Sequence, residues 1–348
     1  MFPGTDIPIE LGAQWLFGAD TNPVANLTSN FWVPRAEFGR ELGGVASLPS
    51  PWTSGAQPLP INSFYVDDNT TLAGNEAMVL GSLQTMVEDM AAAINTSTSS
   101  AILLSSPVFT IHVGELNATV VTGNATEYRS QYVVCTVPLG VLQEGGVAFQ
   151  PPLPPPTSQA LARLEIATTN PVHLLFDQAF WDSRAEAVEL GTSPPGGWVA
   201  FLSLLTFTGR PILVALPGTQ ASLEVEQQTD AKVIESVMSA LRATYGTAVP
   251  DGPTSYVVTR WGLNPYARNT HFTYGTQGSP ADVLTLSEPV SGTLMFAGDS
   301  TNAKFPSTLH GAYLSGVAQA ARIEQALQLP STDNDQCLAQ CYSSGYRV

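Results

Sequence analysis

The sequence predicts an α/β protein built from two interleaved domains. Short apolar or alternating runs, typical of strands, are spread along the whole chain. Two long segments, 76–95 and 230–245, have apolar residues at the helical period. The chain has 348 residues, of which 44% are hydrophobic, with 27 prolines and 29 glycines. This composition suits one large or two intertwined domains with a substantial core and many turns.

The most informative segment of the sequence is a predicted strand, polar loop and helix near the end of the chain. The apolar run 294–297 predicts a buried strand that leads into the carboxylate Asp299. After the loop, Ser307 or Thr308 can cap a helix whose first turn contains Leu309. The backbone amides at such a helix start lack partners within the helix. This sequence therefore predicts a place that can hold the hydroxyl and carbonyl groups of a cofactor.

Small residues recur every four positions on this last helix. Ala312, Gly316 and Ala320 form a ridge that we expect to press closely against a sheet or a flat ligand.

The remaining elements follow from periodicity, caps and turn residues. We expect strands over 7–15, 108–113, 118–122, 132–136, 172–176, 198–205, 212–216 and 255–261, a helix over 76–95 capped by Asn75, an extended crossover at 151–156, a helix starting within 160–166, and a helix over 230–245 ended by Gly246.

Several of these segments together resemble the flavin-containing amine oxidases, the family of polyamine oxidases, monoamine oxidases and lysine-specific histone demethylases. The similar motifs are FAGD at 296–299, HGAYLSG at 310–316, ELGAQW at 10–15, NPV at 22–24, VVCTVPLGVL at 133–142, FW at 180–181 and TRW at 259–261. The resemblance covers residues 7 to about 328. It implies an FAD cofactor and oxidation of a polyamine-like amine to an imine and aldehyde, with release of hydrogen peroxide.

The resemblance also implies site residues. The positions expected to contact FAD are Gly12, Ala13, Gln14, Trp15, Val108, Trp261, Gly298, Asp299, Thr308 and Leu309. Those expected to line an amine seat are Phe17, Phe272 and Tyr274, with Phe305 as a further aromatic candidate. No residue is assigned as catalytic, because the flavin itself carries the chemistry and the protein positions the reactants.

The same resemblance divides the chain into domains. It assigns 1–25, 74–147 and 285–330 to an incomplete Rossmann-type FAD-binding domain, 26–73 and 148–284 to a mixed-sheet substrate domain, and 331–348 to a tail.

Two features depart from the family pattern. Pro171 stands where most members have a lysine that holds a water at the flavin, and a proline cannot replace it. No G-x-G-x-x-G occurs in the chain, although the family uses that fingerprint for the FAD pyrophosphate. We therefore expect the chain to be a fragment or a protein that has lost FAD, and to bind FAD poorly or not at all. The alternative function is a non-catalytic amine-oxidase-like fragment or binding protein.

The net charge of the chain limits the classes of binding partner that the sequence predicts. The net charge of −16 argues against nucleic acid or an anionic membrane and favours a small cationic amine. No run of about 18 apolar residues is present, so no membrane span is expected. Sequons at Asn26, Asn69, Asn95, Asn117 and Asn124 indicate a secreted glycoprotein, although no signal peptide is visible.

Other chemistry has little support in the residues. Gly298-Asp299-Ser300 is similar to the nucleophile block of GDSL-type hydrolases, but no D-x-x-H follows it. The four histidines are dispersed without metal-ligand spacing, so no metal site is expected. Cys135 lies in an apolar strand and is expected to be inert core, whereas Cys337 and Cys341 could pair or stay free.

Overall fold

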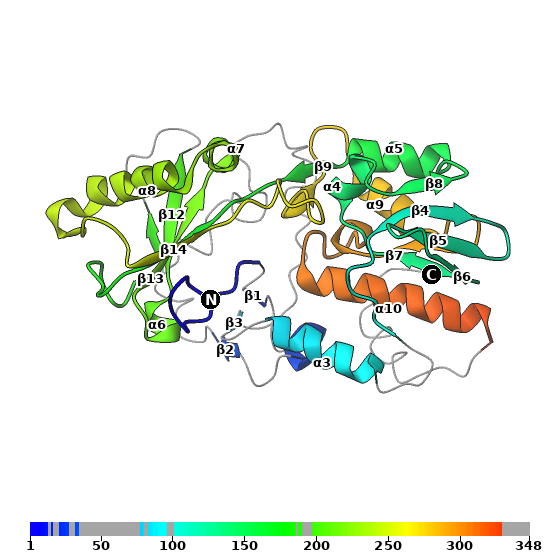
Figure 1. Cartoon of the computed structure of the whole chain (residues 1–348), viewed down its shortest axis with the longest axis horizontal. Coiled ribbons are helices and arrows are strands. Elements are labelled where there is room, and N and C mark those ends of the chain that lie inside the picture. The colour runs from blue at the N-terminus through cyan, green and yellow to red at the C-terminus, as the bar shows by residue number, and fades with distance from the viewer. Residues whose placement is uncertain are drawn as a thin grey trace.

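The computed structural model describes residues 1–12, 15–16, 21–27, 32–34, 77–79, 83–95, 101–185, 187–189 and 197–328. These residues form two lobes, with the chain crossing between them near the paired strands β9 (Glu165–Ala167) and β15 (His271–Thr273) (Figure 1). Helices and several small sheets alternate along the chain, which confirms the predicted α/β class.

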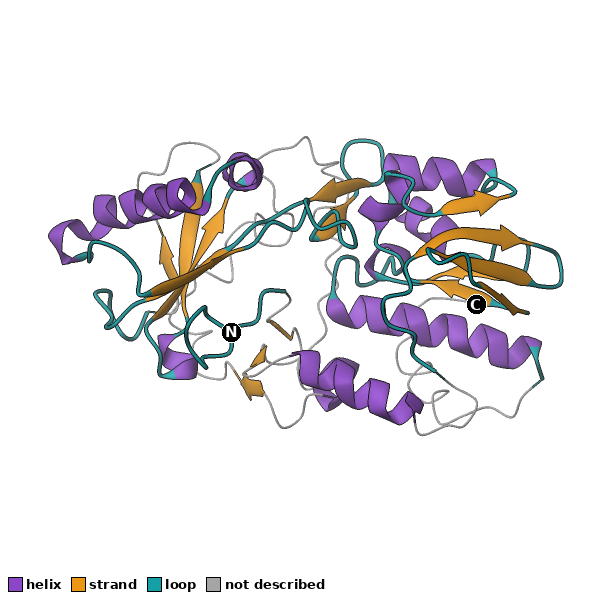
Figure 2. Cartoon of the chain, in the orientation of Figure 1, coloured by secondary structure: helices purple, strands orange, loops and turns teal. Residues whose placement is uncertain are grey.

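One lobe is built on a five-stranded antiparallel sheet. Its strands, in spatial order, are β11 (Ala187–Glu189), β12 (Trp198–Ser203), β13 (Ile212–Pro217), β10 (Val172–Leu175) and β14 (Ser255–Val258). The helices of this lobe are α6 (Leu205–Thr208), α7 (Thr219–Gln227) and α8 (Asp230–Tyr245), and the short helix η3 (Gly246–Ala248) follows α8. Figure 2 shows α7 and α8 on one side of the sheet.

Both faces of this sheet are covered, so the central strands β10 and β13 are mostly apolar. Val172 and Leu174 pack in one core with residues of α7 and α8, while Leu175, whose side chain is on the opposite face of the strand, packs in a second core with Phe2 of the N-terminal segment. A strand buried on both faces reads as a continuous apolar run. Helix α8 has the predicted bounds, and Gly246 follows it with a φ of +57°.

The other lobe combines two sheets with helices. Its sheets contain β6 (Glu127–Ser130), β5 (Ala118–Thr122), β4 (Val108–Val113) and β8 (Ala148–Gln150), and the parallel pair β7 (Val133–Cys135) and β16 (Leu294–Phe296). Its helices are α4 (Leu139–Gln143), α5 (Pro155–Arg163), α9 (Pro280–Ser287), η4 (Asp299–Thr301) and α10 (Leu309–Ala326). Cys135 is buried and free, as expected, and burial raises the pKa of its thiol.

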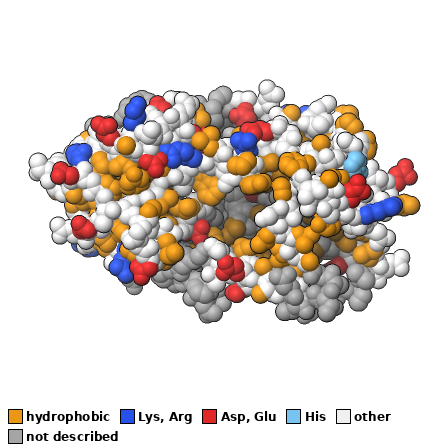
Figure 3. All heavy atoms as spheres, viewed as in Figure 1, with side chains coloured by type: hydrophobic (Ala, Val, Ile, Leu, Met, Phe, Trp, Pro, Cys, Tyr) orange, Lys and Arg blue, Asp and Glu red, His pale blue; other side chains and the backbone are white. Residues whose placement is uncertain are grey.

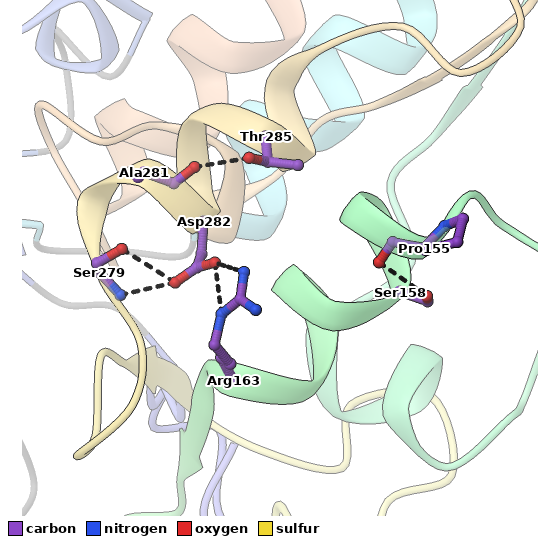
Figure 4. Close-up of polar contacts among 7 residues, drawn as sticks. All are labelled: Pro155, Ser158, Arg163, Ser279, Ala281, Asp282 and Thr285. Carbon is purple, nitrogen blue, oxygen red and sulfur yellow. Dashed lines mark hydrogen bonds and ion pairs between the residues drawn. The ribbon is translucent and has the colours of Figure 1, made fainter.

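Helices α5 and α9 are joined by a polar cluster (Figure 4). The Asp282 carboxylate accepts from Arg163 Nε at 2.9 Å and from the Ser279 backbone N–H at 2.9 Å. Ser279 Oγ donates to the same carboxylate at 3.0 Å. Because Asp282 is buried, these three donors fix the start of α9 against the end of α5.

The first hundred residues contribute smaller elements. They are β1 (Trp15–Leu16), α1 (Pro23–Leu27), β2 (Trp32–Pro34), β3 (Ala77–Val79) and α3 (Leu83–Asn95), with β3 between β1 and β2. Helix α1 and helix α3 share a small core with α10 through Val24, Met86 and Leu309.

Three element predictions were wrong. Residues 7–12 form no strand, because Ile7 and Ile9 pack onto a face of the five-stranded sheet rather than pairing at an edge. The helix expected over 76–95 begins at Leu83, since 77–79 pair on both sides as β3. Its residues Val87 and Met90 are exposed, so only part of the apolar pattern is core.

The helix expected within 160–166 begins earlier, at Pro155 inside the proline tract, and ends at Arg163. Proline is tolerated there because the first-turn amides of a helix have no intrahelical acceptor. Short strands β6, β8, β9, β11 and β15 were not predicted. Asn75, Cys337 and Cys341 lie outside the described residues.

Strand β8 lies beside β4, helix α9 contacts β16, and α5 contacts α9, although the sequence division places β8, α5 and residues 280–284 of α9 in the substrate domain. The domain division itself stays a prediction. Between the lobes the surface is hollowed, and hydrophobic side chains gather around the hollow (Figure 3). Within the described ranges, none of the helices combines the length and hydropathy that crossing a bilayer requires.

Candidate functional site

The site is built where β16 ends. The strand is fully buried beside β7, and the Ala297 N–H donates to Cys135 O at 3.1 Å, which continues the parallel pairing. Gly298 then takes a φ of +147°, a conformation open to glycine, and its N–H donates to Ser315 Oγ at 2.8 Å. A Cβ built on Gly298 would have no atom within 4 Å. The backbone here is therefore open on one side.

Asp299 follows and is half-buried. Burial raises the pKa of its carboxyl above the ordinary value, although the N–H groups of Ser300 and Phe272 donate to it and oppose that shift. No basic side chain in the described part of the chain forms an ion pair with it. The carboxyl is thus held by backbone amides only, and it keeps a proton more readily than an exposed aspartate.

The loop after Asp299 is organised by one side chain. Asn302 Oδ1 accepts from the N–H groups of Lys304 and Phe305 at 3.1 and 3.0 Å. Its Nδ2 donates to Gly311 O in the first turn of α10 at 3.2 Å. Asn302 therefore fixes the loop to the helix that the loop leads into.

Ser307 ties this loop to β15. Its φ is +56°, in the left-handed region that non-glycine residues seldom adopt. Its Oγ donates to Phe272 O at 2.6 Å, and its N–H donates to Asp299 O at 3.4 Å. These two bonds hold the unfavourable conformation and bring β15 to the carboxylate of Asp299.

Helix α10 presents unpaired amides to the site. Thr308 caps the helix, because its Oγ1 accepts from the Gly311 N–H at 3.0 Å. The N–H groups of Leu309 and His310 have no acceptor among the residues that the structure describes. A Cβ on Gly311 would collide with Phe305 O, so this close turn requires glycine. The helix start therefore carries two free donors and the positive end of its dipole.

His310 is buried behind these amides. Asn22 Nδ2, which can only donate, lies 3.5 Å from Nδ1, so Nδ1 accepts and the proton is on Nε2. Nε2 has no hydrogen-bond partner in the described part of the chain, and the ring packs edge-on to Phe305 at 4.8 Å. Burial lowers the pKa of His310 to about 4. The side chain is therefore neutral at physiological pH and links the NPV segment to α10.

The small-residue ridge on α10 is not packed against a sheet, and its alternative role, close approach of a flat ligand, stays a prediction. Gly316 has open space where a Cβ would lie, and Ala320 is exposed. The buried face instead contains Ser315 and Gln319, whose Nε2 donates to Phe296 O at 3.1 Å. The sequence prediction missed Ser315 and Gln319 because it rested on the spacing of the small residues, which carries no signal for buried polar side chains.

The aromatic candidates lie beside the site but belong to the core. The rings of Phe272 and Tyr274 are 5.8 Å apart and perpendicular, and both pack in the cluster that includes Leu286 of α9. It is the backbone of β15, through the Phe272 N–H, that reaches Asp299. Their role in an amine seat stays a prediction.

The other predicted positions are spread over both lobes. Trp15 pairs with Met78 in β1, Val108 begins β4, and Gly12 is exposed at the end of the N-terminal segment. Trp261 is half-buried after β14, where its N–H donates to Asn170 Oδ1 at 2.8 Å. Within the described part of the chain, none of these four residues forms a hydrogen bond or an ion pair with Asp299. Ala13, Gln14 and Phe17 lie outside the described residues.

Comparisons with known proteins agree with this arrangement. The sequence profile described as "Flavin containing amine oxidoreductase" matches residues 55–324. The chain is 32% identical to lysine-specific histone demethylase 1 homolog 3 of Oryza sativa subsp. japonica over 78% of its length. It is 31% identical to human lysine-specific histone demethylase 2 over 75% of its length.

The chain spans about a third of the length of these curated relatives, 35% and 31% respectively. Among solved structures, putrescine oxidase bound to putrescine superposes with a TM-score of 0.59 over 75% of this chain and 56% of that one. The identity to putrescine oxidase is 20%, so that likeness shows the fold. The family profile and the demethylase relatives together show that the chain belongs to the flavin-containing amine oxidases.

Proposed function

We propose that the chain is an FAD-dependent oxidoreductase that oxidises a polyamine-like amine to an imine and aldehyde, with release of hydrogen peroxide. The observation that carries the proposal is the turn from β16 to α10. It presents a carboxyl held by backbone amides and a capped helix with two free N–H groups. The net charge of −16 supports a cationic amine as the substrate class.

The residues of this turn fit the ring end of a flavin. Free amides at Leu309 and His310 suit an electron-rich carbonyl edge, and the obstruction-free side of Gly298 lets a flat group approach the backbone. The Asp299 carboxyl suits a hydroxyl of the cofactor. The 348 residues contain no G-x-G-x-x-G for the pyrophosphate, so the fit concerns the ring end alone.

When bound, FAD supplies a two-electron acceptor for the carbon next to the amine nitrogen. The protein's part is to orient and to shield. The start of α10 stabilises negative charge at its N-terminus by about 0.3–1 kcal/mol, and more when partly buried. His310 stays neutral beside it, so the helix start provides this stabilisation without a contribution from an imidazolium charge. Phe272 and Tyr274 keep water out of the layer behind Asp299.

A second candidate is a non-catalytic protein that keeps the fold but not the cofactor. One sequence feature favours it: Pro171 stands at the place of the family's lysine. In the structure, Pro171 serves the backbone, since its carbonyl accepts from Thr259 Oγ1 at 2.8 Å.

One experiment separates the two candidates. Hydrogen peroxide release is measured from the purified chain with putrescine, spermidine or a dimethyl-lysine peptide, with and without added FAD. Catalysis predicts release that requires both an amine and FAD and that falls in Asp299→Ala. No release at saturating FAD with any of the three amines would leave the binding protein as the function.

N-glycosylation remains part of the proposal. Asn124 lies in the exposed turn between β5 and β6, a position accessible to modification. A mass shift on treatment of the secreted protein with a peptide N-glycosidase is the expected result, and an unchanged mass would remove the prediction.

A further inference from the structure

Trp261 differs from the other well-described tryptophans. Trp181 and Trp198 are buried, and their indole Nε1 atoms donate to Ser203 Oγ at 2.9 Å and Ser236 Oγ at 3.0 Å. Trp261 is only half-buried, and its Nε1 has no acceptor among the described residues. A large aromatic ring that is neither buried nor tied by its polar atom contributes little to the core. Part of this residue is exposed to solvent, where a ligand can reach it.

The backbone around this ring is held unusually firmly. Thr259 Oγ1 donates to Pro171 O at 2.8 Å, and Arg260 Nε donates to Val225 O at 3.0 Å. Arg260 Nη2 also donates to Gln228 O at 3.0 Å and contacts Asp230 at 2.6 Å. The residues before the tryptophan are thus anchored to β10 and to the end of α7.

Trp261 and the residue after it are anchored by the buried Asn170 and the half-buried Glu226. Asn170 is fully buried, and its Oδ1 accepts from the Trp261 N–H at 2.8 Å. Glu226 Oε1 accepts from the Gly262 N–H at 2.7 Å and from Asn170 Nδ2 at 3.0 Å. Asn170 Nδ2 also donates to Ser222 O at 3.1 Å. One carboxylate and one amide therefore hold two consecutive backbone N–H groups.

The Glu226 carboxylate occupies the space where a side chain at Gly262 would lie. A Cβ built there would lie 2.5 Å from Glu226 Oε1 and 2.6 Å from Oε2. The backbone therefore lies directly on the carboxylate. Immediately beyond, the side chains of Leu263 and Tyr266 are exposed.

We propose that Asn170 and Glu226 are positioning residues that lock the turn 259–262, so that the Trp261 ring forms a rigid wall of the amine and flavin site. The inference rests on the proposed function for the identity of the ligand. The locking itself follows from the hydrogen bonds above. The polar ties are made to the backbone, while the ring is left without a polar partner in the described residues. This is the pattern expected when the orientation of a ring matters more than its burial.

Asn170→Asp is the sharpest test. The variant keeps the acceptor for Trp261 N–H but replaces the Nδ2 donor with a carboxylate oxygen facing Glu226. Two carboxylates at hydrogen-bond distance cannot both stay ionised without repulsion, whereas one shared proton restores the link. Hydrogen exchange of the peptide 259–264 should therefore be faster by about tenfold or more at pH 7 and return toward wild type near pH 4.5.

Two matched variants accompany it. Glu226→Gln keeps an amide oxygen for Asn170 and Gly262, so its exchange should stay within about threefold of wild type, whereas Glu226→Ala should exchange as fast as Asn170→Asp. Glu224→Gln on the same helix alters the exposed Gln220–Glu224 hydrogen bond and should leave 259–264 unchanged. In FAD-supplemented peroxide assays, Asn170→Asp and Glu226→Ala should raise KM for spermidine about fivefold with less effect on kcat, and Glu226→Gln should restore it.

Each arm has an outcome that overturns the proposal. Wild-type exchange at 259–264 in both Asn170→Asp and Glu226→Ala would show that the pair does not hold the turn. Faster exchange with unchanged KM would show that the turn is not part of the site. If the wild-type chain releases no peroxide with FAD, the proposed function fails, and the exchange arm alone still decides whether Asn170 and Glu226 lock Trp261.

Discussion

The packing of the site helix can be tested by making the same substitution, glycine to alanine, at two positions of α10. In Gly311→Ala the new Cβ would collide with Phe305 O and lie 2.9 Å from Thr308 Oγ1. In Gly316→Ala the Cβ would have no atom within 4 Å. Both changes gain about 0.5–1 kcal/mol of helix propensity, because alanine replaces glycine inside a helix.

At Gly311 this gain is outweighed. Overpacking against a backbone carbonyl costs about 1–3 kcal/mol, and displacing the Thr308 cap costs about 1 kcal/mol more. We expect Gly311→Ala to be destabilised by about 1–3 kcal/mol and Gly316→Ala to be slightly stabilised. The two variants should therefore differ by roughly 2–4 kcal/mol, or several degrees in Tm.

Urea unfolding followed by circular dichroism measures the free energy of unfolding of both variants and of wild type. Equal stabilities for the two variants would refute the placement of Gly311 against the loop. A large loss in Gly316→Ala would show instead that the small-residue ridge is packed.

Three further predictions concern stability. Burial raises the pKa of Asp299, so its contribution to stability is present below the unfolded pKa and lost as pH rises through the folded one. Asp299→Asn should therefore gain stability relative to wild type as the pH rises above the ordinary aspartate pKa of about 3.9, and a difference that does not change with pH would contradict this. Burial lowers the pKa of His173 to about 4, so the stability that its neutral ring contributes is present above about pH 6.5 and is lost as the pH falls toward 4. The free energy of unfolding of His173→Gln should therefore fall by up to about 3 kcal/mol less than that of wild type across this range. Parallel plots of unfolding free energy against pH for the two proteins would refute this prediction. Ser279→Ala removes a hydroxyl that donates to Asp282 at the start of α9 and should cost about 1 kcal/mol in thermal unfolding, with Ser287→Ala at the end of that helix as the control.

The strand-to-helix turn at the site could be predicted from the sequence because its signals are local. An apolar run, a glycine, a carboxylate and a Thr cap lie within sixteen residues, and β16, Thr308 and α10 were found where the pattern placed them. Helix α8 was predicted for the same reason, since one face carries Val233, Val237 and Leu241 at helical spacing.

What could not be predicted depends on contacts between distant segments. Residues 77–79 became a strand only because β1 and β2 flank them. The carboxyl of Asp299 is reached by the Phe272 N–H, and Trp261 is held by Asn170 across 91 residues. Such partners leave no periodic trace, because a single hydrogen bond constrains one residue and not a repeating face.

The central claim is that the turn from β16 to α10 holds the ring end of a flavin, and a paired titration tests it most directly. Quenching of flavin fluorescence is followed as the purified chain is titrated with riboflavin and, separately, with FAD. Because the ring end is built here and no pyrophosphate fingerprint is present, we predict saturable binding of both, with Kd values within about tenfold, or 1.4 kcal/mol, of each other. Binding should weaken in Asp299→Ala and not in the exposed control Asp251→Ala. Failure of both flavins to bind, or equal binding by Asp299→Ala, would contradict the account.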